Sequence, residues 1–367
     1  MNIKSNILNK FLLFIFLFLF SFSFSFTYAN ADKSVIFYFP NGLPLLSNAN
    51  MILDSSKITD SNGTKKLEYY IDDKKIEYIQ TVLPDELVAS LLKKIPDIAI
   101  VPSNVTAQLY NNGLGYRILG TVGWGSFYIV GKNDVTSFSE IKNKTIYAMG
   151  KGLTPDIILI SILKENGINP EQDVNIQYFA NAEELLSVYL TKNDENVLLV
   201  LPEPNISNLL AVKSQDIKIL FDLNKEWQNI TKSSNGYPQS ALIVKEDFYN
   251  ANSDFIEFFV TELEKSTKAI NNSNSNQISD ILSAVYLQFY FGENFPNINL
   301  KDINPDSLSL RNPFKFFNEN SIKRTNIKFI IAKDSVLEYN IYFNKIAEHN
   351  IKVIGGSIPD EKIFIIK

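Results

Sequence analysis

The chain has 367 residues, with 35 Lys and Arg against 40 Asp and Glu, one His and no Cys. Because 45% of the residues are apolar and 20% are charged, the composition indicates a folded protein with a sizeable core. The lack of cysteine excludes disulfides, thiolate nucleophiles and Cys-based metal sites. One histidine, His349, cannot supply a multi-histidine metal centre. A net charge of -5 argues against nucleic acid as a partner. We therefore expect no metal and no cofactor.

The N-terminal segment has the pattern of an export signal. Lys4 and Lys10 precede an uncharged run over Phe11–Phe26, and Ala29-Asn30-Ala31 offers small residues for a signal peptidase. We expect cleavage after Ala31, which makes residues 1–31 the signal peptide. The alternative is that the segment is retained as a membrane anchor. Without a Cys for a lipid anchor, the mature protein is expected to be free in the periplasm.

After this segment, strands are predicted to alternate with helices. Val35–Phe39 is a β-branched and aromatic run ended by Pro40-Asn41-Gly42, which is typical of a buried strand that leads into a loop. Ile98–Val101 is fully apolar, as in a parallel strand that is covered on both faces. The same patterns predict a strand over 76–81 and helices over 84–94 and 103–110.

The second half of the chain repeats this alternation. Thr145–Met149 predicts a strand, and Gly150–Asp156 leads into a helix that reaches about Asn166. Thr154 is expected to cap this helix, and Ser103 to cap the earlier one. Further strands are predicted over 174–179, 197–201, 217–221 and 240–244, and helices over 182–190, 255–291 and 335–348. Strand, loop and helix in repeated order predict an α/β fold.

Several loops follow the predicted strands, where open α/β sheets bind their ligands. Gly42, Gly125 and Gly152 let the backbone approach a ligand, and the N–H groups at helix starts can donate to a polar or anionic group. The loops in question are 41–44, 102–104, 124–126, 151–154 and 202–204.

Six segments, in their order and spacing, carry a resemblance to a known family. They are Asp97–Asn104, Ser137–Tyr147, Gly150–Asp156, Leu201–Pro204, Pro238–Val244 and Ile354–Asp360. Together they resemble the substrate-binding proteins of ABC importers, in the nitrate/sulfonate/taurine and thiamine-pyrimidine-precursor group. The resemblance spans nearly the whole chain after the signal segment, and the loop after the first strand and the Asn-rich tail match less well.

The resemblance implies a type II periplasmic-binding-protein-like fold, with two lobes joined by two hinge strands. We place the crossings near Val130–Asp134 and Gln239–Val244. Lobe I is then 32–133 with 240–367, and lobe II is 134–239. The lobes would close around a small solute, and the loaded form, expected to be a monomer, would dock on an ABC permease in the inner membrane.

Two residues stand out as ligand contacts. Trp124 lies between Gly123 and Gly125, which leaves an indole face open for stacking; the alternative is a core aromatic. Glu203 lies between two prolines after an apolar strand, where it would pair with an amine of the ligand; the alternative is a carboxylate that satisfies its own helix start.

The other candidates are polar or small residues of the same loops. Lys151 is a candidate for an anionic group, although a solvated loop lysine is the alternative, and Gln239 is a polar candidate at the second crossing. The full set of expected ligand-binding residues is Phe39, Gly42, Leu43, Ser103, Asn104, Trp124, Gly125, Lys151, Gly152, Thr154, Glu203 and Gln239.

These residues favour a small aromatic ligand that carries an amino group, such as a pyrimidine, over a sulfonate. The expected function is solute capture for an importer, without catalysis. Two alternatives stay open, which are an enzyme on the same scaffold, similar to a thiamine-pyrimidine synthase, and a ligand sensor for a membrane receptor.

Overall fold

The computed structural model describes residues 34–61, 64–81, 84–132, 134–192, 194–213, 216–297, 314 and 316–366. Val35–Lys367 is one compact unit. The predicted signal peptide, residues 1–31, lies outside the described residues. Within the described ranges no helix combines the length and the apolar character of a membrane span.

The larger of the two sheets has eight strands in the order β13-β6-β12-β5-β1-β4-β3-β2. At its centre β1 pairs in parallel with β4 and β5, while β12 runs antiparallel between β5 and β6. The parallel centre directs the carboxyl ends of β1, β4 and β5 to one edge. The strands are β1 Val35–Pro40, β2 Ser56–Ser61, β3 Thr64–Ile71, β4 Lys74–Thr81, β5 Ile98–Pro102, β6 Tyr116–Trp124, β12 Pro238–Lys245 and β13 Ile327–Ile331.

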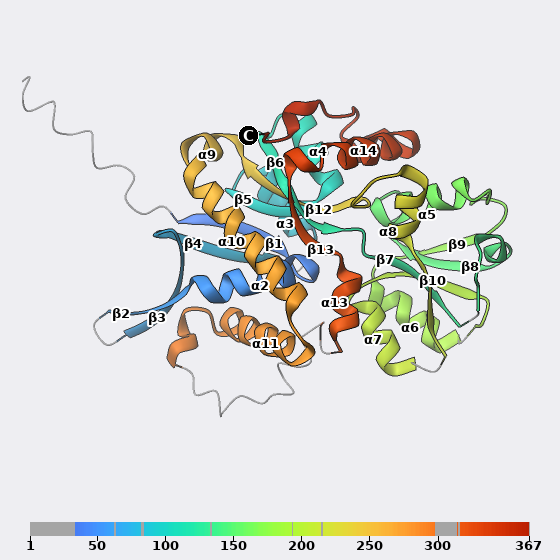
Figure 1. The fold of residues 1–367 in the computed structure, drawn as a ribbon, viewed down its shortest axis with the longest axis horizontal. Coiled ribbons are helices and arrows are strands. Elements are labelled where there is room, and N and C mark those ends of the chain that lie inside the picture. The colour runs from blue at the N-terminus through green and yellow to red at the C-terminus, as the bar shows by residue number, and fades with distance from the viewer. Residues whose placement is uncertain are drawn as a thin grey trace, which may run out of the picture. The chain divides into compact units, whose positions relative to one another are not determined.

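Helices cover both faces of this sheet (Figure 1). Ile98 and Ile100 of β5 join the apolar cluster formed with α2, α10 and α11, while Ala99 and Val101 join the cluster formed with α3, α4 and α14. Since alternate side chains point to opposite faces, the fully apolar run is explained by burial on both sides. The helices are α2 Leu43–Ser55, α3 Pro84–Leu92, α4 Ser103–Asn111, α9 Glu246–Ala251, α10 Ser253–Asn272, α11 Ser275–Phe291, α13 Glu319–Thr325 and α14 Val336–Asn350.

The second sheet has five strands in the order β11-β7-β10-β8-β9. Ile146 and Leu198 face α5 and α8, whereas Tyr147 and Leu199 face α6 and α7. Its strands are β7 Phe127–Gly131, β8 Thr145–Met149, β9 Asn175–Phe179, β10 Val197–Pro202 and β11 Lys218–Asp222. Its helices are α5 Thr154–Glu165, α6 Ala182–Lys192, α7 Asn205–Lys213 and α8 Leu223–Thr231.

The chain passes between the sheets at positions that differ from those expected. Phe127–Gly131, assigned above to lobe I, pairs with β10 and β11 of the five-stranded sheet. Pro238–Lys245 lies wholly in the eight-stranded sheet. The crossings are therefore Gly125-Ser126 and residues 232–237. No polar break marks the first crossing, because apolar residues continue on both sides of it. The division into two lobes stays a prediction.

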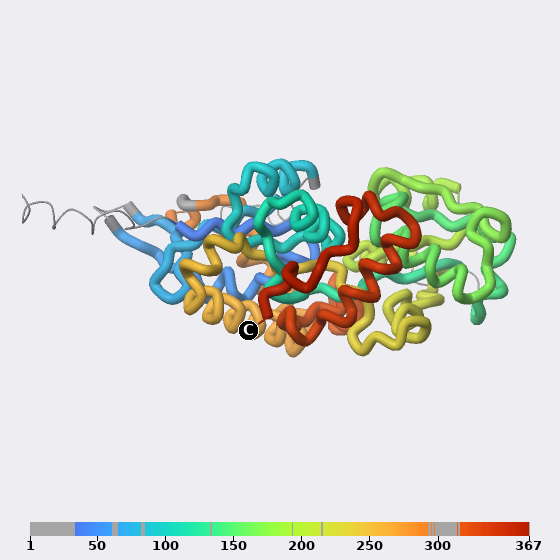
Figure 2. Tube along the Cα trace, turned by 90° about the horizontal axis from the view of Figure 1, so that it is seen from above, coloured from blue at the N-terminus to red at the C-terminus, as the bar shows by residue number. Residues whose placement is uncertain are grey.

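The C-terminal helix α14 packs along α5 and so joins the layers of the two sheets (Figure 2). Tyr342 contacts Thr154, with 2.5 Å between the two hydroxyl oxygens. Further along, Lys345 pairs with Glu165 at 3.4 Å. Because contacts recur along one face of α14, the helix holds α5 over most of its length.

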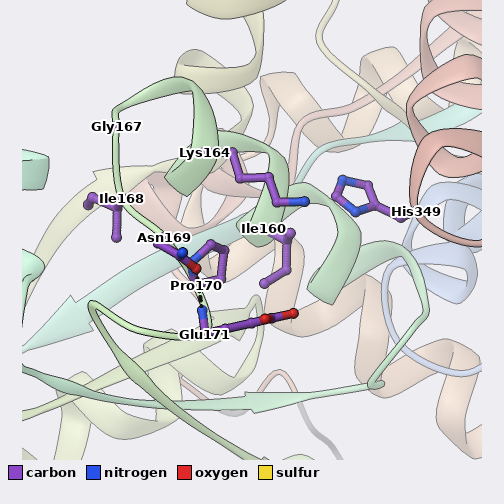
Figure 3. A pocket seen from close by; sticks show the side chains of 8 residues that line it. All are labelled: Ile160, Lys164, Gly167, Ile168, Asn169, Pro170, Glu171 and His349. Atoms are coloured by element: carbon purple, nitrogen blue, oxygen red, sulfur yellow. Dashed lines mark hydrogen bonds between the residues drawn. The ribbon is translucent and has the colours of Figure 1, made fainter.

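His349 provides the last of these contacts. Its Nε2 lies 3.2 Å from Ser161 Oγ, beside a cavity of about 670 Å³ that Lys164 also lines. Figure 3 shows the Lys164 side chain extending toward the imidazole. The side chain is half-buried, and burial together with the Lys164 ammonium lowers the pKa of His349 from its ordinary value of 6.5.

This environment predicts a loss of stability in mild acid. A histidine whose pKa is lowered on folding binds its proton more readily in the unfolded state, so the free energy of unfolding falls as pH drops below about 6.5. Urea unfolding of wild type and His349→Asn between about pH 8 and pH 5 tests this. The variant should lose stability less steeply. Parallel curves for the two proteins would contradict the assignment.

Candidate ligand-binding site

Two helices, one from each sheet layer, begin side by side at the junction between the sheets. The helix α4 follows β5 and starts at Ser103, and α5 starts at Thr154 shortly after β8. Thr154 Oγ1 donates a hydrogen bond of 3.5 Å to Asn104 Oδ1 across the junction. The structure thus brings Ser103, Asn104 and Thr154 together, as expected for loops at strand carboxyl ends.

Neither expected cap is formed. The N-cap positions are Pro102 and Leu153, and no side chain caps either helix. Thr154 instead uses its hydroxyl for Tyr342 and Asn104. The N-terminal N–H groups of both helices therefore depend on other partners, and their partial positive charges lie near each other.

The turn before α5 is held by one carboxylate. Asp156 Oδ2 accepts from Gly152 N at 2.7 Å, and Asp156 Oδ1 accepts from Tyr178 OH at 2.5 Å. Lys151 is exposed, with its ammonium 5.3 Å from the centre of the Tyr178 ring. Leu153, which sequence analysis did not single out, leaves 48% of its surface exposed.

The turn after β1 is also fixed from within. Gly42 has φ of 85°, which favours glycine, and its N–H donates to Asn41 Oδ1 at 2.8 Å. Tyr286 OH donates to the same oxygen at 3.0 Å. Leu43 begins α2 and packs partly into the core.

Phe39 lies in the core and not in an open pocket. Its side chain is 0% exposed, and its ring lies 5.2 Å from Phe37 and 6.2 Å from Tyr78 and Phe289, between ring centres. The alternation of buried positions along β1 places it inside, and the sequence did not show this because the whole strand is apolar or aromatic.

Trp124 is fully buried at the end of β6. The ammonium of Lys328 lies 5.5 Å from the centre of its ring, within the range of a cation–π contact. Its indole Nε1–H has no hydrogen-bond partner among the residues that the structure describes. The face expected to stack on a ligand is therefore in contact with a lysine of β13.

Gly125 and Gln239 hold the two crossing segments close to each other. A Cβ on Gly125 would lie 2.3 Å from the Tyr237 ring and 2.4 Å from Asn224 Oδ1. Glycine is thus required here by packing, whereas sequence analysis assigned it to ligand approach. Gln239 Oε1 accepts from Ser126 N at 3.0 Å and from Ser126 Oγ at 3.2 Å, which ties one crossing to the other.

Glu203 has an internal partner. Its carboxylate accepts a 2.6 Å hydrogen bond from Arg324 Nε and bonds of 3.1 Å from Ser207 N and Oγ. The Glu203 side chain is 0% exposed, and that of Arg324 is 18% exposed. Burial raises the pKa of Glu203, and the Arg324 guanidinium opposes that rise. The carboxylate is therefore neutralised before any ligand arrives.

Sequence analysis missed Arg324, which lies far from Glu203 along the chain. No local pattern identifies this partner, because the pairing depends on how α13 packs against α7, where Ser207 and Ser321 are in contact.

Removing the cation of this ion pair should lower the free energy of unfolding by an amount that depends on pH. Arg324→Met should cost about 3–5 kcal/mol in the free energy of unfolding at neutral pH, because it leaves a buried charge unpaired. Because the pKa of Glu203 is raised, its carboxylate is protonated and becomes neutral in mild acid. The stability lost in Arg324→Met should therefore become smaller as pH falls. Urea unfolding at about pH 7 and pH 5 measures both effects.

The matched control is the double variant Glu203→Gln/Arg324→Met. It removes both charges and should recover most of the stability lost in the single variant. If the single and double variants were equally unstable at neutral pH, the charge would not be the cause.

Comparison with solved structures identifies the fold. An ABC transporter from Parabacteroides distasonis aligns with a TM-score of 0.68 at 22% identity, over 92% of this chain and 100% of that one. The periplasmic aliphatic sulphonate binding protein SsuA from Escherichia coli aligns with a TM-score of 0.62 at 10% identity, over 92% and 93%. The alkanesulfonate-binding protein SsuA from Xanthomonas axonopodis pv. citri, bound to MOPS, gives 0.54 at 11% identity, over 91% and 97%. The predicted periplasmic-binding-protein-like α/β fold is confirmed.

Sequence comparison gives partial matches of a different kind. No family model matches the chain. A DNA recombination protein RmuC homolog from Rickettsia typhi is 23% identical over 255 residues, which are 62% of this chain and 54% of that protein. A homolog from Rickettsia felis is 30% identical over 132 residues, 36% of this chain and 27% of that protein. The chain thus spans about half or less of the length of these curated relatives.

Proposed function

We propose that this chain is an extracytoplasmic solute-binding protein of an ABC importer. It would hold a small organic solute at the junction of its two sheets and present it to a membrane permease, without catalysis. The fold supports this role, because the solved structures that share it include periplasmic binding proteins. The predicted export signal supports the location.

One observation carries the proposal, which is that α4 and α5 begin next to each other across the junction. Each helix has at least nine residues, and the contact between Asn104 and Thr154 joins them. A solute between these starts would touch both layers at once. Only a ligand with contacts to both sides can favour the closed arrangement.

The charges around the junction favour an anionic solute, such as a sulfonate, over an amine. The starts of α4 and α5 both present partial positive charge. Glu203, the carboxylate expected to receive an amine, is paired with Arg324, and Trp124 faces Lys328. The two residues that favoured an amino-bearing aromatic are thus engaged within the protein.

Solute entry requires the junction to open on the side away from α14. One buried apolar cluster contains residues of both layers, among them Ala99 and Ile157, and α14 contributes Tyr339, Tyr342 and Phe343 to it. Separation along α14 would expose this cluster to water and is costly. The helix would therefore serve as the fixed side of the closing motion.

A catalytic role receives no support from the one histidine. His349 lies beside Ser161, seven residues along α5 from Thr154, or about 10 Å of helix. The nucleic-acid role in the names of the curated relatives is not proposed, since this chain has a net charge of -5.

A thermal-shift panel of taurine, an alkanesulfonate, nitrate and a pyrimidine tests the ligand class. A ligand that binds only the folded protein raises the free energy of unfolding, by about 2.7 kcal/mol at a concentration 100 times its Kd, and so raises the melting temperature. We expect sulfonates to stabilise the protein and the pyrimidine to have no effect. Stabilisation by the pyrimidine alone would reverse the proposed class, and no effect from any compound would count against the proposal.

Movement of the two sheet layers toward each other is measured separately, by fluorescence energy transfer between dyes attached to one residue in each layer. The chain has no native Cys, so Lys93→Cys and Lys192→Cys can be labelled specifically, one exposed site in each layer. A sulfonate that stabilises the protein should change the transfer efficiency. The control pair Lys164→Cys and Lys192→Cys lies within one layer and should not respond. Equal responses of the two pairs would exclude a motion between the layers.

A further inference from the structure

A second cavity lies where α8, β13 and α13 meet, away from the starts of α4 and α5. Its volume is about 310 Å³, which is at the lower end for small-molecule sites. Trp124, Lys323 and Lys328 line it from the eight-stranded layer, and Asn224 and Lys225 line it from the five-stranded layer. Anything bound here would contact both layers.

The charge in this cavity is positive. Lys225, Lys323 and Lys328 line it, while Asp222 is the one acidic residue among the described residues of its lining. Asp222 is occupied in part as the N-cap of α8, where it accepts from two backbone N–H groups, and its oxygen is 3.9 Å from Lys225 Nζ. Glu338 lies close enough to act on Lys328. Three ammonium groups therefore face two carboxylates.

Lys328 is held in place within the cavity. Its ammonium donates to Asn235 Oδ1 at 2.8 Å and lies over the Trp124 ring. Partial burial lowers the pKa of Lys328, and the nearby Glu338 opposes that effect. Lys328 is an exposed residue, and its ammonium has N–H groups left for an anionic acceptor.

Trp124 supplies an independent observation. Its side chain is 0% exposed and lines the cavity, and its Nε1–H is buried without a partner in the described part of the chain. A buried donor without an acceptor costs about 1–3 kcal/mol. Because Nε1 is closed off from solvent in this arrangement, a ligand oxygen would recover that energy only if the indole shifts toward the cavity. The same ligand oxygen would be attracted to the lysines.

Two side-chain amides add acceptors. Asn271 Nδ2 donates to Ile327 O at 2.6 Å, and Gln228 Nε2 donates to Ser234 O at 2.7 Å. The oxygens of both amides accept no hydrogen bond from the described residues, and both residues line the cavity. They suit hydroxyl groups of a ligand.

We propose that this cavity is a second binding site, which takes a small organic anion that also carries hydroxyl groups. The anionic group would lie between Lys323 and Lys328, beside Trp124, and the hydroxyl groups would donate to Asn271 and Gln228. Because the lining comes from both layers, occupancy would favour one arrangement of the layers over others.

The test uses Trp124 as its own reporter. The chain has two tryptophans, so Trp227→Phe leaves Trp124 as the single emitter. Glycerol 3-phosphate, inorganic phosphate, sulfate and glycerol are titrated at low salt, with calorimetry on the unsubstituted protein in parallel. We expect a saturable change in emission with glycerol 3-phosphate, weaker binding of phosphate and sulfate, and none of glycerol.

Lysine variants locate the binding. In the Trp227→Phe protein, Lys323→Gln and Lys328→Gln should each weaken binding by about tenfold. The control Lys93→Gln changes an exposed lysine that follows α3 and should leave binding unchanged. Circular dichroism checks that each variant is folded. Two results would overturn the proposal: no saturable binding of any anion by fluorescence or calorimetry, or equal affinity in all three lysine variants. Equal affinities for phosphate and glycerol 3-phosphate would contradict the proposed recognition of hydroxyl groups by Asn271 and Gln228.

Discussion

The meeting of the two sheets is set by close packing at Gly125. Tyr237 and Asn224 occupy the space that any larger side chain would need, and Gln239 joins the neighbouring Ser126 to the returning chain. With both crossings fixed at this point, the strand ends of the two layers face each other. The starts of α4 and α5, the ion pair of Glu203 and the cavity at Trp124 all follow from that placement.

The strands were predictable where burial leaves a pattern in the sequence. Thr145–Met149 has the predicted bounds, and Ile98–Val101 is a central strand covered on both faces. The hairpin of β2 and β3 was missed because Ser56–Ser61 is largely polar and lies at the edge of the sheet, where one side meets solvent. An edge strand needs few apolar residues, so its pattern resembles a loop.

The sequence predicted which loops meet at the candidate site, but not which partners their side chains have. The loops after β5 and β8, which belong to different sheets, do meet across the junction. Their partners, however, are distant in the chain. Arg324 neutralises Glu203, and Tyr342 occupies the hydroxyl of Thr154. Since no local pattern encodes these pairings, Trp124 and Glu203 look available in the sequence and are engaged in the folded protein.

The order of strands in the eight-stranded sheet has a consequence for biogenesis. The strand β5 lies between β1 and β12, and β12 follows the entire five-stranded sheet along the chain. A polypeptide that emerges from its N-terminus can assemble the smaller sheet while the larger one still lacks β12, β13 and α14. Non-local pairing of this kind slows folding and leaves strand edges unpaired until the last segments arrive. The edge of β5 is therefore open to aggregation until β12 has emerged, which is after every strand of the five-stranded sheet.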